Sequence, residues 1–358
     1  MTTRGITAGV DGSPESLAAA EWAADEAVRR GTSLRLLHAW RWEPLDLPLV
    51  QNPETEAERA RVLLEAALTR VCDRRPELEV TATVVPEHAV PALLRESRDA
   101  ELLVLGSRGH GAVLGFLLGS YGQQVIAEAH CPVVSVRRPG GPGTHLNHLP
   151  DHATPGRGGP HRDASGGTEP DGVASGAAKP DGVASGGKEP DRLVSGPEGP
   201  GRRAPGGEEF RPGADGEVVV GVQGGADESA DVLRFAFGAA RARGSRLRAV
   251  RAWSLPPLYA YSPGSLALAD EAGGLEPYER KALGAVLAPW RERFPDVQVT
   301  EHVEIGSAGQ VLLSAAGRAA LLVVGRRVRR TPVGPRIGST AHAALHHAHC
   351  PVAVVPHP

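Results

Sequence analysis

A glycine-rich segment followed by a serine is the part of the sequence best suited to bind an anion. Within residues 102–136, Gly106, Gly109, Gly119 and Ser120 follow a G-x2-G-x9-G-S spacing between two apolar runs. The loop therefore leaves a buried strand and enters a helix at its last glycine. Backbone N–H groups of such a loop, with the partial positive charge of the helix start, bind phosphate oxygens. The spacing predicts a nucleotide site, and the alternative is a tight strand-to-helix turn without a ligand.

Asp11 is the second candidate for chemistry, because it directly follows the first apolar run, residues 6–10. Ser13 after it is a good helix N-cap, and Pro14 suits the first helical position. Asp11 therefore contacts a ligand, caps this helix, or does both. Ligands of parallel sheets bind beyond the carboxyl ends of the strands, at the switch point of the strand order. If the strands before Asp11 and Gly106 are neighbours, both residues face one crevice.

Strands and helices alternate through residues 1–137, which must position these groups. Apolar patterning predicts strands at 6–10, 34–40, 80–85, 102–105 and 133–136, and helices from 14 to about 31, from about 54 to 73, from Pro91, and from Gly119. Such alternation is typical of parallel βαβ units. We expect an α/β fold, with a doubly wound, mostly parallel five-stranded sheet that has helices on both faces.

Residues 217–358 repeat this pattern with changes in the candidate site. The first strand recurs at 218–222, the closing His-Cys-Pro-Val of 130–133 recurs at 349–352, and Gly325 and Gly338-Ser339 keep the loop spacing. Gln223 stands in the place of Asp11, and Val328 in that of Gly109. A β-branched residue resists positive φ and fills space that a phosphate needs. We expect a second domain of the same fold that binds nucleotide poorly or not at all.

Two clusters in the second half are candidates for other ligands. Arginines at 326, 327, 329 and 330 either hold an anion or form a solvated loop, and the second is favoured. Histidines at 342, 346, 347 and 349 are placed on the last helix, where i,i+4 pairs can bind a metal. No carboxylate accompanies them at matching spacing, so we expect a helix surface that gains charge below pH ~6.5 instead of a metal site.

Residues 138–216 differ in composition from both flanking regions. They contain no Ile, Met, Trp, Tyr or Cys, their single aromatic residue is Phe210, and a ten-residue unit such as DGVASGAAKP repeats within them. Such a repeat buries too little apolar surface to offset the entropy of ordering. We expect a disordered Gly/Pro-rich linker, with an end-to-end distance of roughly 50 Å if it is flexible.

Composition limits the remaining function classes. The formal net charge of -3 does not favour binding to nucleic acid or to an anionic membrane, and we expect neither as a partner. No apolar run approaches the roughly 20 residues of a membrane span, and no signal region is seen at the start. Three cysteines without a CxxC argue against a disulfide framework, so a cytoplasmic location is expected. Cys131 and Cys350 precede prolines, where a small buried residue fits better than a redox group.

Together, Val10-Asp11-Gly12-Ser13, the G-x2-G-x9-G-S segment and the His-Cys-Pro-Val strand resemble the universal stress protein family in its tandem, two-domain form. The likeness covers residues 3–137, and 217–356 with the departures noted. It implies ATP as the ligand of the first domain, alone or with Mg²⁺. By this likeness the site residues are Asp11, Ala39, Gly106, Gly109, Gly119 and Ser120. The first two border adenine, and the others lie against ribose and phosphates.

The resemblance also implies pairing through the last strands, 133–136 and 352–355, either within one chain or in a homodimer. No residue is marked out as catalytic, because Asp11 would lie at the base end of the nucleotide, away from the γ-phosphate. The expected function is that of an ATP-binding regulatory protein of the stress response, and not of an enzyme. A slow ATPase and a dimerising scaffold that acts without nucleotide are the alternatives.

Overall fold

The computed structural model describes residues 5–40, 53–107, 120–138, 216–254, 274–328 and 337–358. The predicted linker, 138–216, lies almost wholly outside the described residues. So do two of the predicted site residues, Gly109 and Gly119.

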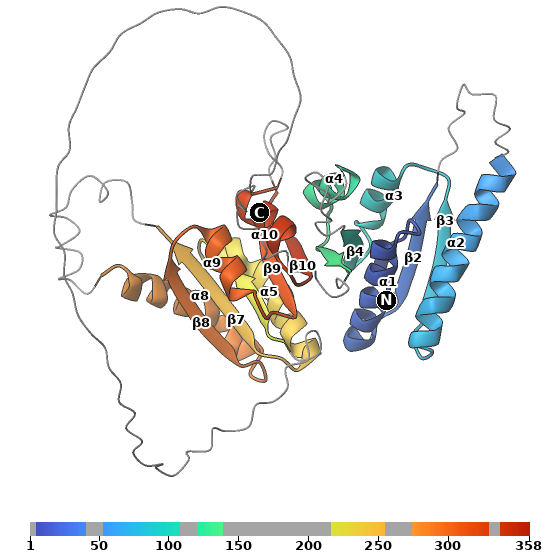
Figure 1. The fold of residues 1–358 in the computed structure, drawn as a ribbon. Helices are drawn as coiled ribbons and strands as arrows, with labels where there is room; N and C mark the ends of the chain where they lie inside the picture. Colours follow the sequence, from blue (N-terminus) through green and yellow to red (C-terminus); the bar gives the residue numbers. More distant parts are fainter. Residues whose placement is uncertain (1–4, 41–52, 108–119, 139–215, 255–273, 329–336) are drawn as a thin grey trace, which may run out of the picture. The chain divides into compact units, whose positions relative to one another are not determined.

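The first half alternates strands and helices as the sequence predicts (Figure 1). Its elements are β1 (Ile6–Gly9), α1 (Pro14–Arg30), β2 (Leu34–Ala39), α2 (Pro53–Arg74), β3 (Val80–Val85), α3 (Ala89–Glu96), β4 (Leu102–Ser107), α4 (Ser120–Glu128) and β5 (Val133–Arg137). Most boundaries agree with expectation to within one residue, and two differ by two residues. Helix α3 begins two residues before Pro91, and Gly106 lies within β4 instead of after it.

The second half repeats this order. Its elements are β6 (Val218–Gly221), α5 (Ala226–Arg243), β7 (Leu247–Trp253), α8 (Glu276–Arg293), β8 (Val299–Ile305), α9 (Ala308–Ala315), β9 (Leu321–Arg327), α10 (Ser339–His347) and β10 (Val352–His357). The internal duplication seen in the sequence is therefore a duplication of the fold.

The strands form one ten-stranded sheet in the order β3-β2-β1-β4-β5-β10-β9-β6-β7-β8. Neighbours within each half are parallel. The last strands of the two halves, β5 and β10, pair antiparallel. The two predicted five-stranded sheets are thus joined edge to edge within the chain, and each covers the edge that the other would expose.

Helix α1 is well specified by its sequence. The Ser13 hydroxyl accepts a hydrogen bond from the Ser16 N–H at 3.2 Å, and Pro14 takes the first helical position. The helix ends at Gly31. Its sheet-facing side consists mainly of alanines, Ala19, Ala20, Ala23, Ala24 and Ala27, all almost fully buried. These small side chains let α1 approach the sheet closely, which places its first turn against the strand ends.

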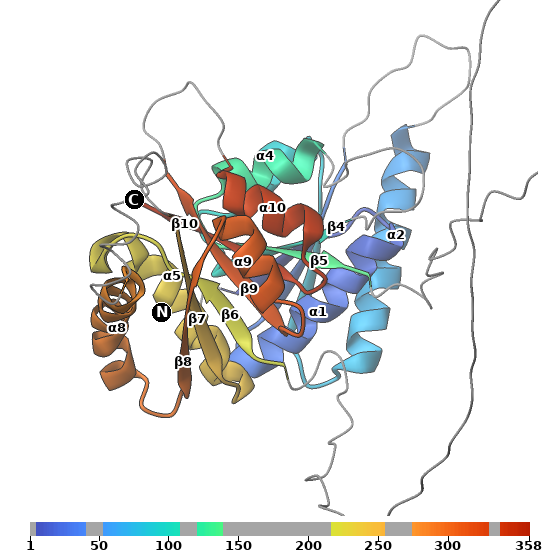
Figure 2. The same ribbon diagram turned by 60° about the vertical axis from the view of Figure 1, so that its left-hand side comes forward.

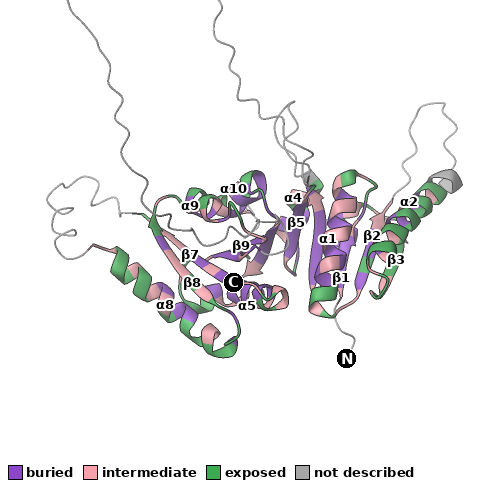
Figure 3. Ribbon diagram, turned by 60° about the horizontal axis from the view of Figure 1, so that its bottom comes forward, coloured by how far each residue is buried: buried purple, intermediate pink, exposed green. Residues whose placement is uncertain are grey.

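Helices cover both faces of the sheet and enclose a core on each. Alternation along β4 sends Leu102 and Val104 into the core under α1 and α2, and Leu103 and Leu105 into the other core. The second half follows the same plan, and Figure 2 shows α9 and α10 together over one face. In Figure 3 the central strands are buried, whereas the outer sides of α2 and α8 are exposed. None of the helices in the described ranges is both long and apolar enough to cross a membrane.

Candidate functional site

The switch point of the first half lies between β1 and β4. In the strand order β3-β2-β1-β4-β5, strands β2 and β3 lie on one side of β1, and strands β4 and β5 lie on the other. The order of the strands therefore reverses between β1 and β4, where Ala8 pairs in parallel with Val104. The expectation that these strands are neighbours is confirmed. Connections leave the carboxyl ends of β1 and β4 toward opposite faces, and ligands of such sheets bind in the crevice formed there.

Asp11 lies in the turn from β1 into α1. Its carboxylate Oδ1 accepts hydrogen bonds from the Ser13 backbone N–H at 2.9 Å and from the Ser13 hydroxyl at 2.5 Å. Its own N–H donates to the Ser16 hydroxyl oxygen at 3.2 Å. Gly12 between them has φ of 80°, which an L side chain rarely adopts. Asp11 thus has a capping role, because its Oδ1 accepts hydrogen bonds from Ser13 at the start of α1.

Gly106 faces the same helix turn from the end of β4. A Cβ added to it would lie 2.5 Å from the carbonyl carbon of Glu15 and 2.6 Å from the backbone N of Ser16. These are backbone atoms, so they have little freedom to move aside. Gly106 is therefore required for close packing of β4 on α1, a structural role beyond the one expected from the sequence. The contact also places Gly106 and Asp11 around one helix N-terminus.

The remaining described site residues lie at the same edge of the sheet. Ala39 is the last residue of β2 and pairs with Val85 of β3. The neighbouring His38 holds a ring nitrogen, Nδ1, 2.7 Å from the carbonyl oxygen of Val10, directly before Asp11. Sequence reasoning missed this contact, because nothing in a strand pattern marks which side chain reaches the adjacent strand. Ser120 is the first residue of α4.

The second half contains a cleft at the equivalent position. It has a volume of about 620 Å³ and is lined by the ends of β6, β7 and β9 and by the start of α10. Gln223, Gly325 and Ser339 line it, as expected from the repeat. The second half, in which Gln223 and Val328 replace two residues of the predicted nucleotide motif, thus has a cleft at this position.

Charged groups in this cleft already have partners. Arg251 Nε lies 2.5 Å from Glu279 Oε2, and Arg327 Nη2 lies 3.3 Å from Glu228 Oε2. The His357 ring packs against Gly325, with two ring atoms 2.8 Å from the place of a Cβ. Burial lowers the pKa of His357 below its ordinary value, which favours the neutral ring. His357 therefore lies close to the glycine of the second cleft, and both of these arginines are paired with a carboxylate.

Two expectations for the second half are wrong. Arg326 does not belong to a solvated loop, because it lies in β9 with 5% exposure and donates from Nη2 to the Ala129 carbonyl oxygen of the first half at 2.6 Å. The histidines do not all lie on an exposed helix surface, since His346 is 8% exposed and His349 follows the end of α10. Arg329 and Arg330 lie outside the described residues.

The cysteines are where the sequence predicts them. Cys131 and Cys350 are buried, and burial raises the pKa of Cys350 to about 11, so its thiol stays protonated at neutral pH. In the described part of the chain, no group of three or more His, Cys, Asp and Glu side chains is arranged to hold a metal ion.

Comparison with known proteins agrees with this architecture. The family model "Universal stress protein family" matches residues 2–137 and 216–356. A universal stress protein of Mycobacterium tuberculosis (Rv2005c) is 28% identical over 359 residues, which cover 98% of this chain and 96% of that one. One from Mycolicibacterium smegmatis is 40% identical over 138 residues, 37% of this chain and 45% of its own.

The same architecture occurs among solved structures. The crystal structure of a universal stress protein from Archaeoglobus fulgidus superposes with a TM-score of 0.58 at 13% identity, covering 98% of both chains. That likeness concerns the fold. With the family match over both halves, it shows that this chain belongs to the universal stress protein family and contains two copies of its domain.

Proposed function

We propose that the first half binds one adenine nucleotide, ATP, and that the protein is a nucleotide-dependent regulator and not an enzyme. The observation that carries the proposal is the meeting of Asp11, Gly106 and the N-terminus of α1 at the β1/β4 switch point. An exposed acidic group beside a glycine and a helix start suits a ligand with a polar base at one end and phosphates at the other.

In the proposed arrangement the adenine lies beside the ends of β1 and β2, and the phosphates lie beside the end of β4 and the start of α4. Asp11 and Ala39, at the ends of β1 and β2, border the adenine. Gly106 and the N-terminus of α4 at Ser120 lie toward the phosphates, with Gly109 and Gly119 between them in sequence. Mg²⁺ would accompany the phosphates. Asp11 holds its Oδ1 toward Ser13, which supports a role in capping and recognition instead of general base catalysis.

We further propose that the second cleft binds ATP weakly or not at all. Gln223 replaces the carboxylate, Val328 replaces a glycine, and the His357 ring lies on the glycine that remains. Each change acts against a nucleotide, by exchange of a carboxylate oxygen for an amide N–H donor, by restriction of the loop, or by occupying space.

Calorimetric titration of the full chain with ATP, ADP and AMP tests the proposal through matched variants in the two halves. Asp11→Ala and Gly109→Val are expected to weaken ATP binding at least tenfold, about 1.4 kcal/mol. Gln223→Ala, at the equivalent position of the second half, is the control and is expected to leave binding unchanged. Absence of binding by the wild-type chain, or an equal loss in Gln223→Ala, would refute the assignment.

A gain-of-function variant tests the asymmetry from the other side. Gln223→Asp combined with Val328→Gly restores two positions of the motif in the second half. We expect weak binding of a second ATP, measured as an increased stoichiometry in the same titration. If the wild-type chain already binds two nucleotides with equal affinity, the asymmetry is disproved.

A further inference from the structure

The pairing of β5 with β10 places the two halves around a local two-fold axis. Val134 of β5 lies opposite Ala353 of β10, with Ser135 opposite Val352 and Val133 opposite Val354. Val134 and Ala353 occupy equivalent positions in the repeated His-Cys-Pro-Val segments. Because equivalent residues face each other, the axis runs through this pair, and equivalent helices α1 and α5 meet across it.

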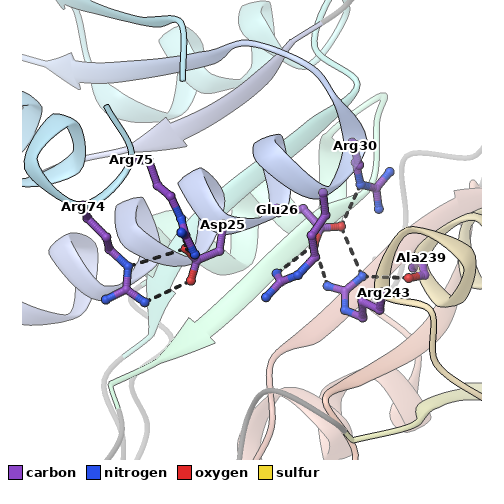
Figure 4. A network of polar contacts seen from close by, with 8 residues as sticks. Asp25, Glu26, Arg30, Arg74, Arg75, Ala239 and Arg243 are labelled. Carbon is purple, nitrogen blue, oxygen red and sulfur yellow. Dashed lines mark hydrogen bonds and ion pairs between the residues drawn. The ribbon is translucent and has the colours of Figure 1, made fainter. Parts of the chain in front are cut away.

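A buried carboxylate crosses this boundary. Glu26 of α1 has a fully buried side chain, and its oxygens lie 2.7 Å from Arg30 Nε in its own helix and 2.6 Å from Arg243 Nη2 in α5 (Figure 4). The Arg243 side chain is 7% exposed and that of Arg30 is 13% exposed. Arg243 also donates to the Ala239 carbonyl oxygen at 3.0 Å. One carboxylate thus neutralises cations from both halves.

The two arginines are equivalent residues, whereas the carboxylate has no equivalent. Arg30 and Arg243 each directly precede the glycine that ends their helix, Gly31 and Gly244. Counting back from these glycines, Glu26 corresponds to Ala239. Arg30 and Arg243 are therefore equivalent cations, whereas the carboxylate between them comes from the first half alone. Arg30 Nη1 also donates to Glu101 of the same half at 2.7 Å, whereas within the described residues its Nη2 has no hydrogen-bond partner.

Both arginines also reach an aromatic ring of the opposite half. The Arg30 guanidinium carbon lies 5.0 Å from the ring centre of Phe235, and that of Arg243 lies 5.8 Å from the ring centre of Trp22. Trp22 and Phe235 are themselves equivalent in the two helices. Such cation–π contacts add a modest stabilisation. They would be available in any pairing of the halves, so they do not distinguish one pairing from another.

The Glu26 carboxylate does distinguish the possible pairings of the two halves. Two first halves paired around the same axis would bring two Glu26 and two Arg30 together, a balanced set. Two second halves would bring together two Arg243 and no carboxylate, because Ala239 stands at the position of Glu26. A buried charge without a counter-ion is strongly destabilising. Pairing with a first half therefore gives Arg243 a carboxylate that a pair of second halves does not contain.

Arg326, a second buried arginine of the second half, also favours pairing with a first half. Arg326, buried in β9, lies near Glu128 of α4, which attracts it, and donates to the neighbouring Ala129 carbonyl oxygen. In a pair of second halves the residue equivalent to Glu128 is His347. Arg326 would then face an imidazole instead of a carboxylate. Both buried arginines of the second half thus meet an acidic residue that only the first half carries.

We propose that the face of the second half formed by α5 and β9 is selective for a first half, and that Glu26 is the residue that determines this selectivity. The occupant of this face is the first half of the same chain. Pairing of two second halves, through β10 with β10, is excluded by the unpaired arginines that it would bury. The last strands therefore join a first half to a second half, as β5 and β10 do here.

Cleavage of the full-length chain tests the proposal. A recognition sequence for a site-specific protease is inserted after residue 175, the folded chain is cut, and the fragments are separated by size-exclusion chromatography with light scattering. We expect the two halves to co-elute as a 1:1 pair. Elution as separate dimers of first halves and of second halves would overturn the proposal.

Substitution of Glu26 identifies the determinant. Glu26→Gln keeps the shape of the side chain, and we expect the co-eluting share of the second half to fall at least tenfold. Glu21→Gln on the same helix is the matched control, because Glu21 pairs with Arg74 of its own half. An unchanged 1:1 pair in the cut Glu26→Gln chain would also overturn the proposal.

A second variant decides the question if the Glu26→Gln chain fails to fold. Arg243→Gln removes one of the two buried cations that make self-pairing of second halves unfavourable, and it leaves Glu26 paired with Arg30. After cleavage we expect dimers of second halves to appear that the wild-type chain does not form. Failure of such dimers to appear would show that Arg243 does not govern pairing.

Discussion

Replacing Gly106 by alanine should destabilise the first half through backbone crowding. The added Cβ would lie 2.5 to 2.6 Å from three backbone atoms of Glu15 and Ser16, where contacts below 3.0 Å essentially never occur. Either β4 or the first turn of α1 must therefore move by about half an ångström or more. Overpacking of this kind costs about 1–3 kcal/mol of unfolding free energy. The same shift separates Gly106 from Asp11, so ATP binding should weaken as well.

Gly9→Ala provides the matched control for this substitution. Gly9 lies on the neighbouring strand, but a Cβ there would meet only the Leu105 and Leu93 methyl groups, at 3.0 and 3.4 Å. Side-chain ends can adjust, so the loss should be below that of Gly106→Ala. Both variants are compared with the wild-type chain by urea unfolding followed by circular dichroism. Equal unfolding free energies for the two variants would refute the crowding argument.

Three further outcomes follow from the described contacts. Burial acts to raise the pKa of Glu26, but the charges and hydrogen bonds of Arg243 and Arg30 outweigh it and hold that pKa below its usual value. Arg29 and Glu101 are the other charged groups beside this pair. The stability that Glu26 contributes is then complete above pH ~4.5 and is lost as the pH falls through the lower folded value, so Glu26→Gln should flatten the acid limb of urea-unfolding curves. Cys350, with its pKa near 11, should react with iodoacetamide at pH 8 much more slowly than the partly exposed Cys72, as peptide mapping would show. Ser13→Ala should cost about 0.5–2 kcal/mol of unfolding free energy and leave ATP affinity nearly unchanged, because it removes the α1 cap but retains the Asp11 carboxylate. The Glu26 ion pairs would be contradicted if Glu26→Gln kept the acid sensitivity of the wild type. Equal reaction rates of Cys350 and Cys72 would contradict the raised pKa of Cys350, and unchanged stability of Ser13→Ala would contradict its capping role.

The order of elements could be predicted from the sequence because local signals agree with the fold. Alternation of apolar strands with helices such as α1, which has Ser13 as its cap and alanines on one side, leaves few arrangements other than a parallel sheet. The neighbouring positions of β1 and β4 follow from the same topology. The switch point, and with it the location of the candidate site, was therefore accessible from the sequence.

Contacts that depend on side-chain direction were not accessible. The sequence does not indicate that Arg326 turns inward toward Ala129, because a run of arginines reads equally well as a solvated loop. In the sequence, Glu26 is one of several polar residues on its helix, and nothing there indicates that it pairs with Arg243 of α5. The sequence predicts that Gly106 belongs to a loop, whereas in the structure it lies in β4 and its close contact with Glu15 gives it a packing role. In each case the decisive partner is distant in the sequence.

The number of ATP molecules bound by each chain tests the central claim most directly. Equilibrium dialysis of the full-length protein with labelled ATP, carried out in parallel on the wild type and on Gly109→Val, measures it. We predict saturation at one ATP per wild-type chain and loss of that ATP in the variant. No bound ATP, two equivalent sites, or full binding by Gly109→Val would contradict a single nucleotide site in the first half.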